Sequence, residues 1–488
     1  MRQSVNMRMN VNISLKTILA LLPIFYQSSS TPVGDGLSSL GGAQANGKTW
    51  ALLIAGTNGW TYYRHQLMAT QQKQANVCHA YKVLAEKYKI PKDRIITMMY
   101  DDVANDARNP FPGTLKNEPN GPDVYKGVVK DYTGEDVNLI TMNKILSGDK
   151  KGLEGKGSGK VIEPDPKNRI FIFFTGTGGK GGFSRLIHDS IWADVFAKTL
   201  IDLRKSKKFK EALVFWESSH SGNMFEYVLP YNSGVLAMTS TASSEDSFGW
   251  YCNVDNLPVC LAGHFSFSWI SAAEQDGAEK LSIFEHYNAV RIAVNTSHPN
   301  LYGSFKLGTK KLNYFIGPKS TVEDGESVQE SDIFSSPNVV AHDLTPRNEQ
   351  FPMIGGIAEK DIPTAMLEYE VKTAKSKEEK ALKSEELVSL KKKRNFMEST
   401  MDSIVDYSIK RAAPSTPKVQ KTNYSESRRC FKRLAVRFQN TCFNYSNYYV
   451  DHILPRLFDI CKSGAESEGH EAMSTICTPE HRSLNYVV

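Results

Sequence analysis

Two apolar runs that each end abruptly in small and polar residues constrain the fold of this chain most. Residues 169–178 read RIFIFFTGTG, and residues 211–222 read EALVFWESSHSG. An unbroken apolar run of about five residues that stops at Gly or Ser is typical of a strand buried on both faces of a parallel sheet. Loops that leave the carboxyl ends of such strands hold the sites of open α/β proteins. The pattern therefore predicts an α/β domain whose site lies at residues 176–178 and 217–222.

Glycines after the first run match a pattern that is found in nucleotide-binding proteins. Gly176, Gly178 and Gly181 satisfy GxGxxG, and Asp194 follows at roughly the distance of an acid that binds the ribose of a dinucleotide. However, the glycines do not follow the first predicted strand, and Asp194 falls inside a predicted helix at 190–204. A lone GxGxxG is weak support for a nucleotide site. We therefore expect a flexible turn here and keep a nucleotide-binding module as the alternative of another class.

The amino-terminal residues predict a secretory signal peptide at 1–30. Basic residues precede an apolar run at 17–26, and small residues follow it. This run is about half the roughly 20 residues that a membrane span needs, and no later run is longer. Residues 31–47 are rich in Gly and Ser, so we expect a disordered lead. The chain is expected to enter the secretory pathway without a membrane span.

The seven cysteines fit such an oxidising compartment. Cys252 and Cys260 form a close pair, and Cys78 is expected to be a buried thiol that acts as a small hydrophobe. No CxxC or HxxxH spacing occurs, so we predict no metal site. The remaining four lie close together near the carboxyl end and predict two disulfides with three possible connectivities: Cys430, Cys442, Cys461 and Cys477.

The charge of the chain bears on its partners, and its sequons bear on its location. The formal net charge is +6 on 488 residues, and the basic residues lie among acidic ones, which argues against nucleic acid as a partner. Nothing in the sequence predicts a cofactor. Asn295, Asn423 and Asn444 begin glycosylation sequons, which fits a secreted glycoprotein.

Around both apolar runs the sequence resembles the legumain, or asparaginyl endopeptidase, family of cysteine proteases. The segments NGWTYYRHQ at 58–66, NPFPG at 109–113 and DYTGEDV at 131–137 are also similar to that family. In legumains the second run continues EACESG and the first ends DHG, which supply the nucleophilic Cys and its His base. Here those stretches read ESSHSG and GTG, so Ser219 stands at the Cys position and Thr177 at the His position.

The resemblance implies a fold and a domain order. It implies an α/β domain with a caspase-like, mostly parallel sheet flanked by helices, followed by an all-α, disulfide-stapled domain that resembles the legumain prodomain. It also implies the pairs Cys430–Cys461 and Cys442–Cys477, and a Cys252–Cys260 bridge like that of plant members. The expected parts are a signal peptide (1–30), a disordered lead (31–47), the caspase-like domain (48–317), a linker (318–363) and the helical domain (364–488).

The resemblance further implies a substrate pocket. Asn58 corresponds to an active-site Asn, and the pocket is expected to comprise Arg64, His65, Glu217 and Ser247. An asparagine side chain needs one donor and one acceptor, which Arg64 and Glu217 provide; alternatively these two are simply an ion pair that holds the cleft together. The second acid of the family falls at Gly263.

Residues 67–74, LMATQQKQ, interrupt what is continuous in the family. They are either an insertion that lengthens a loop beside the cleft or a gene-prediction error.

The two substitutions predict loss of chemistry. A serine hydroxyl is a weak nucleophile without a base, and Thr177 can act as neither base nor acid; losing such a group typically costs on the order of a million-fold in turnover. His220 is adjacent to Ser219, but neighbouring side chains on an extended segment point apart, and the sequence shows no third group to orient the imidazole. We therefore expect His220 to be a surface or loop residue.

These observations favour a pseudoprotease that binds Asn-containing peptides or a protease partner, for example an active legumain-type protease. The alternative is an asparaginyl endopeptidase with residual activity through Ser219 in vacuolar or lysosomal protein processing. The expected location is the lysosome, the vacuole or the extracellular space. In the family the helical domain caps the active site until it is removed, so here a permanent cap is expected.

Overall fold

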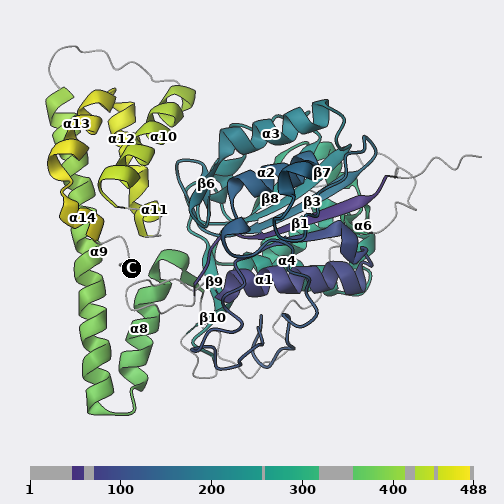
Figure 1. Ribbon diagram of the computed structural model, residues 1–488, viewed down its shortest axis with the longest axis horizontal. Coiled ribbons are helices and arrows are strands. Elements are labelled where there is room, and N and C mark those ends of the chain that lie inside the picture. Colours follow the sequence, from purple (N-terminus) through teal and green to yellow (C-terminus); the bar gives the residue numbers. More distant parts are fainter. Residues whose placement is uncertain are drawn as a thin grey trace, which may run out of the picture. The chain divides into compact units, whose positions relative to one another are not determined.

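The computed structural model describes residues 47–59, 71–254, 259–317, 356–412, 424–443 and 449–483 (Figure 1). A six-stranded sheet in the order β11-β8-β7-β3-β1-β2 organises the first part of the chain. All neighbouring strands are parallel except the edge strand β11, which is antiparallel to β8. The predicted α/β class with a mostly parallel sheet is confirmed. The strands are β1 (Thr49–Ala55), β2 (Ile95–Met98), β3 (Arg169–Thr175), β7 (Glu211–Glu217), β8 (Val235–Thr239) and β11 (Asn300–Gly303).

The two apolar runs form the neighbouring strands β3 and β7. Their side chains alternate between two cores because successive residues of a strand point to opposite faces. Phe171 and Phe215 lie in the core that includes helices α1 (Gln71–Lys82) and α4 (His264–Glu274), whereas Ile172 and Trp216 lie in the other. Figure 1 shows α1 and α4 on one face of the sheet, and α2 (Leu139–Ser147) and α3 (Ala193–Lys205) on the opposite face. Both faces are covered, which explains why these runs are apolar throughout.

Helix α1 begins earlier than the sequence predicts. The expected helix spanned 75–88, whereas α1 starts at Gln71 and continues into a π-helical turn at Val83–Lys87. Residues 71–74 of the interrupting segment therefore form the first helical turn rather than a longer loop; residues 60–70 lie outside the described part. The extra turn is anchored by polar contacts, since Gln74 Nε2 donates to Asp102 Oδ1 at 2.7 Å.

The apolar run LNYFIG at 312–317 predicts a closing strand of the sheet, and this prediction is wrong. These residues form helix α6 (Leu312–Ile316), and the edge of the sheet is taken by β11 instead. Leu312, Phe315 and Ile316 are all buried, at a spacing that fits one face of a helix. An apolar run of six residues satisfies a short helix as well as a strand, so its pattern alone does not separate the two.

The carboxyl-terminal part is helical, as predicted. Its core joins Met401 and Ile404 of α9 with Phe431 and Leu434 of α10. The predicted linker is partly structured, because residues 356–363 form a strand, a turn and the start of α8, while 318–355 lie outside the described part. The helices are α8 (Ile362–Thr373), α9 (Lys377–Ala412), α10 (Tyr424–Thr441), α11 (Tyr449–Ile453), α12 (Leu457–Lys462), α13 (Glu466–Ile476) and α14 (Pro479–Ser483).

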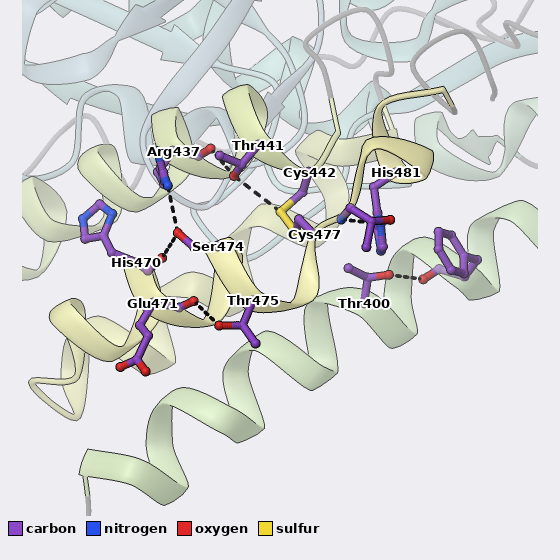
Figure 2. Close-up of a disulfide and its surroundings, with 12 residues drawn as sticks. Thr400, Arg437, Thr441, Cys442, His470, Glu471, Ser474, Thr475, Cys477 and His481 are labelled. Carbon is purple, nitrogen blue, oxygen red and sulfur yellow. Dashed lines mark hydrogen bonds between the residues drawn. A yellow bond between two sulfur atoms is a disulfide. The ribbon is translucent and has the colours of Figure 1, made fainter.

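Three disulfides staple the structure, with all three expected pairings confirmed. Figure 2 shows one of them, between the end of α10 and the end of α13, with α9 alongside. Cys78 is a free, buried thiol, and burial raises its pKa. No helix among the described residues is both long and apolar enough to cross a membrane. The pairs are Cys252–Cys260, Cys430–Cys461 and Cys442–Cys477.

Candidate functional site

The loops that follow β3 and β7 leave the sheet side by side. Thr175 and Glu217, the last residues of the two strands, lie opposite each other in parallel register. The loops then touch, because a Cβ atom added at Gly178 would lie only 2.9 Å from the carbonyl oxygen of Ser219. The structure thus brings the Thr177 loop and the Ser219 loop into one site.

The hydroxyl of Ser219 is held by two groups. Ser219 Oγ accepts a hydrogen bond from the backbone nitrogen of Ser247 at 3.0 Å and donates to Glu359 Oε2 at 3.3 Å. The side chain of Ser219 is half-buried. Its hydroxyl proton is therefore directed at a carboxylate.

The imidazole of His220 is turned away from the hydroxyl of Ser219. Its Nδ1 lies 3.2 Å from the carbonyl oxygen of Ser243, and its Nε2 lies 3.4 Å from Asp246 Oδ1. Burial alone would raise the pKa of Asp246, but hydrogen bonds from His220 and Lys360 lower it below its ordinary value. His220 is a loop residue, as expected, but it is buried rather than at the surface. Asp246 is a group that could orient an imidazole, which the sequence did not reveal, yet both ring nitrogens already have partners other than Ser219.

Thr177 contacts the helical region through a buried ion pair. Its Oγ1 donates to Asp451 Oδ2 at 3.3 Å, and Asp451 lies on α11. Arg185 Nε donates to Asp451 Oδ1 at 2.7 Å, and a second guanidinium nitrogen binds the same oxygen. Arg185 and Asp451 are both buried. Burial raises the pKa of Asp451 even though Arg185 opposes this shift.

His452, the next residue of α11, makes the stability of the fold sensitive to acid. Burial and the neighbouring charge of Lys360 lower the pKa of His452 from 6.5 to about 4. Between these values the unfolded chain binds a proton that the folded chain does not, so this contribution to stability falls as the pH falls. Linkage gives about 2 kcal/mol lost between pH 7 and pH 5.

We therefore expect His452→Gln to flatten the dependence of the unfolding free energy on pH by that amount. Urea titrations at pH 5 and pH 7 measure it. His470→Gln, a substitution of a more exposed histidine on α13, is the control and should leave the difference unchanged. An unaltered pH dependence in His452→Gln would contradict the assignment.

Glu217, which is expected in the substrate pocket, is fully buried. It accepts hydrogen bonds from Thr175 Oγ1 at 2.6 Å and from Asn76 Nδ2 at 3.2 Å. Ser266 donates twice more, from its backbone nitrogen at 3.1 Å and from its Oγ at 2.7 Å. A Cβ atom at Gly263 would lie far inside contact distance of this carboxylate. The position expected to have lost a second acid therefore has no room for any side chain while Glu217 is held this way.

Lys73 is the cation beside Glu217. Its Nζ lies 3.6 Å from Glu217 Oε2 and also bonds Glu359 Oε1, and the lysine is almost completely buried. Burial lowers the pKa of Lys73, but the charges of Glu359 and Glu217 outweigh this and raise it above its ordinary value. Lys73 thus stays protonated and cannot serve as a base for Ser219.

Glu359 enters the site from an extended segment. Strand β12 (Ile357–Ala358) pairs antiparallel with β9 (Phe248–Cys252), which in turn pairs with β10 (Cys260–Gly263). The backbone nitrogen of Glu359 continues this ladder by donating to Ser247 O at 2.9 Å. Its side chain is buried, and burial raises its pKa. The last residues of the predicted linker therefore lie along β9 as a third strand.

The other residues expected in the pocket are only partly described. Asn58 is half-buried just beyond the end of β1, and Ser247 contributes its backbone nitrogen and oxygen. Arg64 and His65 lie outside the described residues, so the expected pair of Arg64 with Glu217 stays a prediction. Of the sequons, Asn295 is exposed after α5 (Ile283–Ala293), whereas Asn423 and Asn444 are not described.

The nucleotide-binding alternative is wrong. A dinucleotide site needs the glycine loop to open a helix. Here Gly176, Gly178 and Gly181 lead into an antiparallel sheet of β4 (Gly178–Gly179), β5 (Phe183–Leu186) and β6 (Asp189–Trp192), and α3 begins only afterwards. Gly181 is packed against the ring of Phe431, which leaves no room for a Cβ atom, let alone a phosphate. The loop is a packed hairpin rather than the expected flexible turn, and Asp194 is exposed in the first turn of α3.

Sequence reasoning missed several charged residues of the site, among them Lys73, Glu359 and Asp451. Lys73 belongs to the interrupting segment, Glu359 to the predicted linker and Asp451 to the predicted helical domain, so no local pattern marked them. Within the described ranges, no group of three or more His, Cys, Asp or Glu side chains is arranged to hold a metal ion.

Comparisons with known proteins agree with the sequence resemblance. Residues 49–318 match the peptidase C13 family. The chain is 32% identical over 432 residues to the hemoglobinase of Schistosoma mansoni, which covers 88% of this chain and 91% of that protein. Legumain of Mus musculus is 29% identical over 464 residues, covering 94% and 98%, and the vacuolar-processing enzyme delta-isozyme of Arabidopsis thaliana is 31% identical over 439 residues, covering 86% and 88%. Among solved structures, caspase-1 from Spodoptera frugiperda matches 57% of this chain and 92% of its own at 11% identity, with a TM-score of 0.32, a similarity too low to bear on function.

Proposed function

This chain belongs to the peptidase C13 family, and from that premise we propose that it is a legumain-like pseudoprotease, which binds peptide or protein ligands without hydrolysing them. The proposal assigns Ser219 to the position of the nucleophile and Thr177 to the position of the base. Nucleophilic hydrolysis requires a nucleophile and a base within hydrogen-bonding reach of each other.

One observation carries this proposal: both hydroxyls face carboxylates. Ser219 Oγ donates to Glu359, and Thr177 Oγ1 donates to Asp451. Neither makes a hydrogen bond to an imidazole within the described part of the chain, and the histidine next in sequence, His220, is bound to Ser243 and Asp246. Among the described residues, no imidazole is placed to take the hydroxyl proton and later return it to the leaving amine.

The contacts that cover both hydroxyls support the same proposal. The strand at Ile357–Ala358 pairs with β9, Glu359 accepts the Ser219 hydroxyl, and Asp451 accepts the Thr177 hydroxyl. A chain without hydrolytic chemistry cannot cut its own linker, so this cap is permanent unless an active legumain-type protease cleaves it in trans. Such a protease is the protein partner that we propose.

The proposed location is the secretory pathway, with the lysosome, the vacuole or the extracellular space as the destination. Three disulfides and an exposed sequon at Asn295 support this proposal. Disulfides persist in oxidising compartments.

One contact, between Ser219 and Glu359, favours the alternative of residual endopeptidase activity. Ser219 Oγ donates to Glu359 at 3.3 Å, and a carboxylate can accept a proton from a hydroxyl. Glu359, however, lies where a bound peptide would pair with β9, so it has to leave before a substrate enters. The same experiment separates the two functions.

We expect the full-length chain to release no product from an Asn-containing fluorogenic peptide between pH 5 and pH 7. The rate should lie on the order of a million-fold below that of an active legumain-type protease assayed in parallel. Ser219→Ala should not change the signal, and Ser399→Ala, at an exposed position on α9, is the matched control. Product formation that Ser219→Ala abolishes would overturn the pseudoprotease proposal in favour of residual activity.

A further inference from the structure

We infer that the cleft beside β7 binds peptides through a glutamate side chain, with Lys73 as the cation that selects it over asparagine or glutamine. This inference rests on the proposed function, since it names the side chain that a peptide-binding pseudoprotease would accept. It replaces an asparagine pocket, built from Arg64 and Glu217, with a carboxylate pocket built from Lys73 and Ser219.

The first step of the argument is the backbone of the present occupant. Ile357 lies opposite Gly249 and Ala358 opposite Phe248 in antiparallel register, and Glu359 N bonds Ser247 O. An extended peptide that adds a strand to a sheet edge gains main-chain hydrogen bonds whatever its sequence. Main-chain hydrogen bonds to the edge of β9 would therefore bind a peptide of any sequence. The position that Glu359 occupies would select the side chain of the peptide.

The second step is the hydrogen-bonding character of that pocket. Both oxygens of Glu359 meet donors: Lys73 Nζ bonds Oε1, and Ser219 Oγ donates to Oε2. Ser247 N donates to Ser219 Oγ at 3.0 Å, so the hydroxyl proton of Ser219 is left for the carboxylate. A carboxylate offers each of these donors a charged acceptor, whereas a glutamine or asparagine offers Lys73 either a neutral carbonyl oxygen or an NH2 donor. The preference for a glutamate therefore comes mainly from the charge of Lys73.

The third step is the positive charge of Lys73, which needs a direct partner when Glu359 is absent. Glu217 is satisfied by Thr175, Asn76 and both donors of Ser266, so it does not depend on Lys73 alone. Lys73 lies 3.6 Å from Glu217 and bonds Glu359 directly. A ligand carboxylate is thus the direct partner of a buried lysine, and charge-assisted hydrogen bonds of this kind are stronger than neutral ones.

The experiment removes the side chain that now fills the position beside Lys73 and offers peptides in trans to compete for it. Full-length Glu359→Ala is titrated with three fluorescently labelled peptides, GGIAEKD, GGIAQKD and GGIANKD, by anisotropy; the first copies residues 355–361. We expect the Glu peptide to bind at least ten-fold tighter than the other two. Adding Lys73→Met should remove this preference, whereas adding Lys198→Met, at an exposed lysine of α3, should preserve it.

A second variant keeps the test valid if Glu359→Ala does not fold. Glu359→Gln keeps the size of the side chain, and its full-length chain should show the same ten-fold preference with weaker overall binding. Equal or tighter binding of the Gln or Asn peptide would overturn the inference, and so would the absence of binding by all three peptides. The mass of each peptide after incubation reports hydrolysis separately: a cleaved peptide would contradict the pseudoprotease proposal, and a Glu preference without cleavage would support both.

Discussion

Replacing Asp451 with alanine is expected to lower the unfolding free energy of the chain by about 3–5 kcal/mol, because it removes the carboxylate that pairs with a buried guanidinium. Arg185 is the charge that would be left, and its side chain is fully buried. The substitution also removes the acceptor of the Thr177 hydroxyl. Urea denaturation followed by far-UV circular dichroism measures the loss.

The matched control for this prediction is Asp402→Ala. Asp402 pairs with Arg456 at 2.6 Å in the same helical region, but 65% of its side chain is exposed. Exposed ion pairs typically contribute about 0–1 kcal/mol. A loss in Asp451→Ala no larger than that of the control would show that the buried pair does not hold α11 against the loop of Thr177.

Replacing Lys73 with methionine is expected to cost about 3–5 kcal/mol at neutral pH, because Glu217 and Glu359 would then share a buried site without a cation. The cost should shrink as the pH falls. Burial raises the pKa of Glu359 above its ordinary value of 4.5, so this carboxyl takes up a proton first and removes one of the two charges. Thermal and urea unfolding at pH 5 and pH 7 test both the size and the sign.

Two further variants decide whether charge is the cause. Lys198→Met removes a lysine whose side chain is 75% exposed and should cost less than about 1 kcal/mol. Lys73→Met combined with Glu359→Gln should recover much of the lost stability, because only Glu217 then remains charged and it keeps its four hydrogen bonds. A cost that is independent of pH and unrelieved by Glu359→Gln would point to lost packing instead.

Together these predictions describe a site that is closed by ion pairs within the chain. Lys73 and Arg185 belong to the α/β domain, while Glu359 comes from the predicted linker and Asp451 from the helical region. Each pair lies next to one of the two hydroxyls that we propose stand at the catalytic positions of the family. The same contacts that stabilise the fold therefore also keep Ser219 and Thr177 out of reach.

Much of the scaffold was predictable from local sequence. The runs at 169–175 and 211–217 are largely apolar because both faces of β3 and β7 are buried. Burial that affects every residue of a strand leaves an apolar run that can be recognised in the sequence. The run at 312–317 was misread because six apolar residues satisfy a short helix equally well. The cysteine pairs followed from the resemblance, and all three exist.

The sequence by itself determined which two loops meet, since each buried strand ends at a fixed point and parallel neighbours end at the same edge. Only the tertiary structure decided what the site contains. Lys73 and Glu359 are 286 residues apart, and Thr177 and Asp451 are 274 apart. A buried charge is stable only beside a partner, and no periodicity along the chain records which distant residue will be that partner.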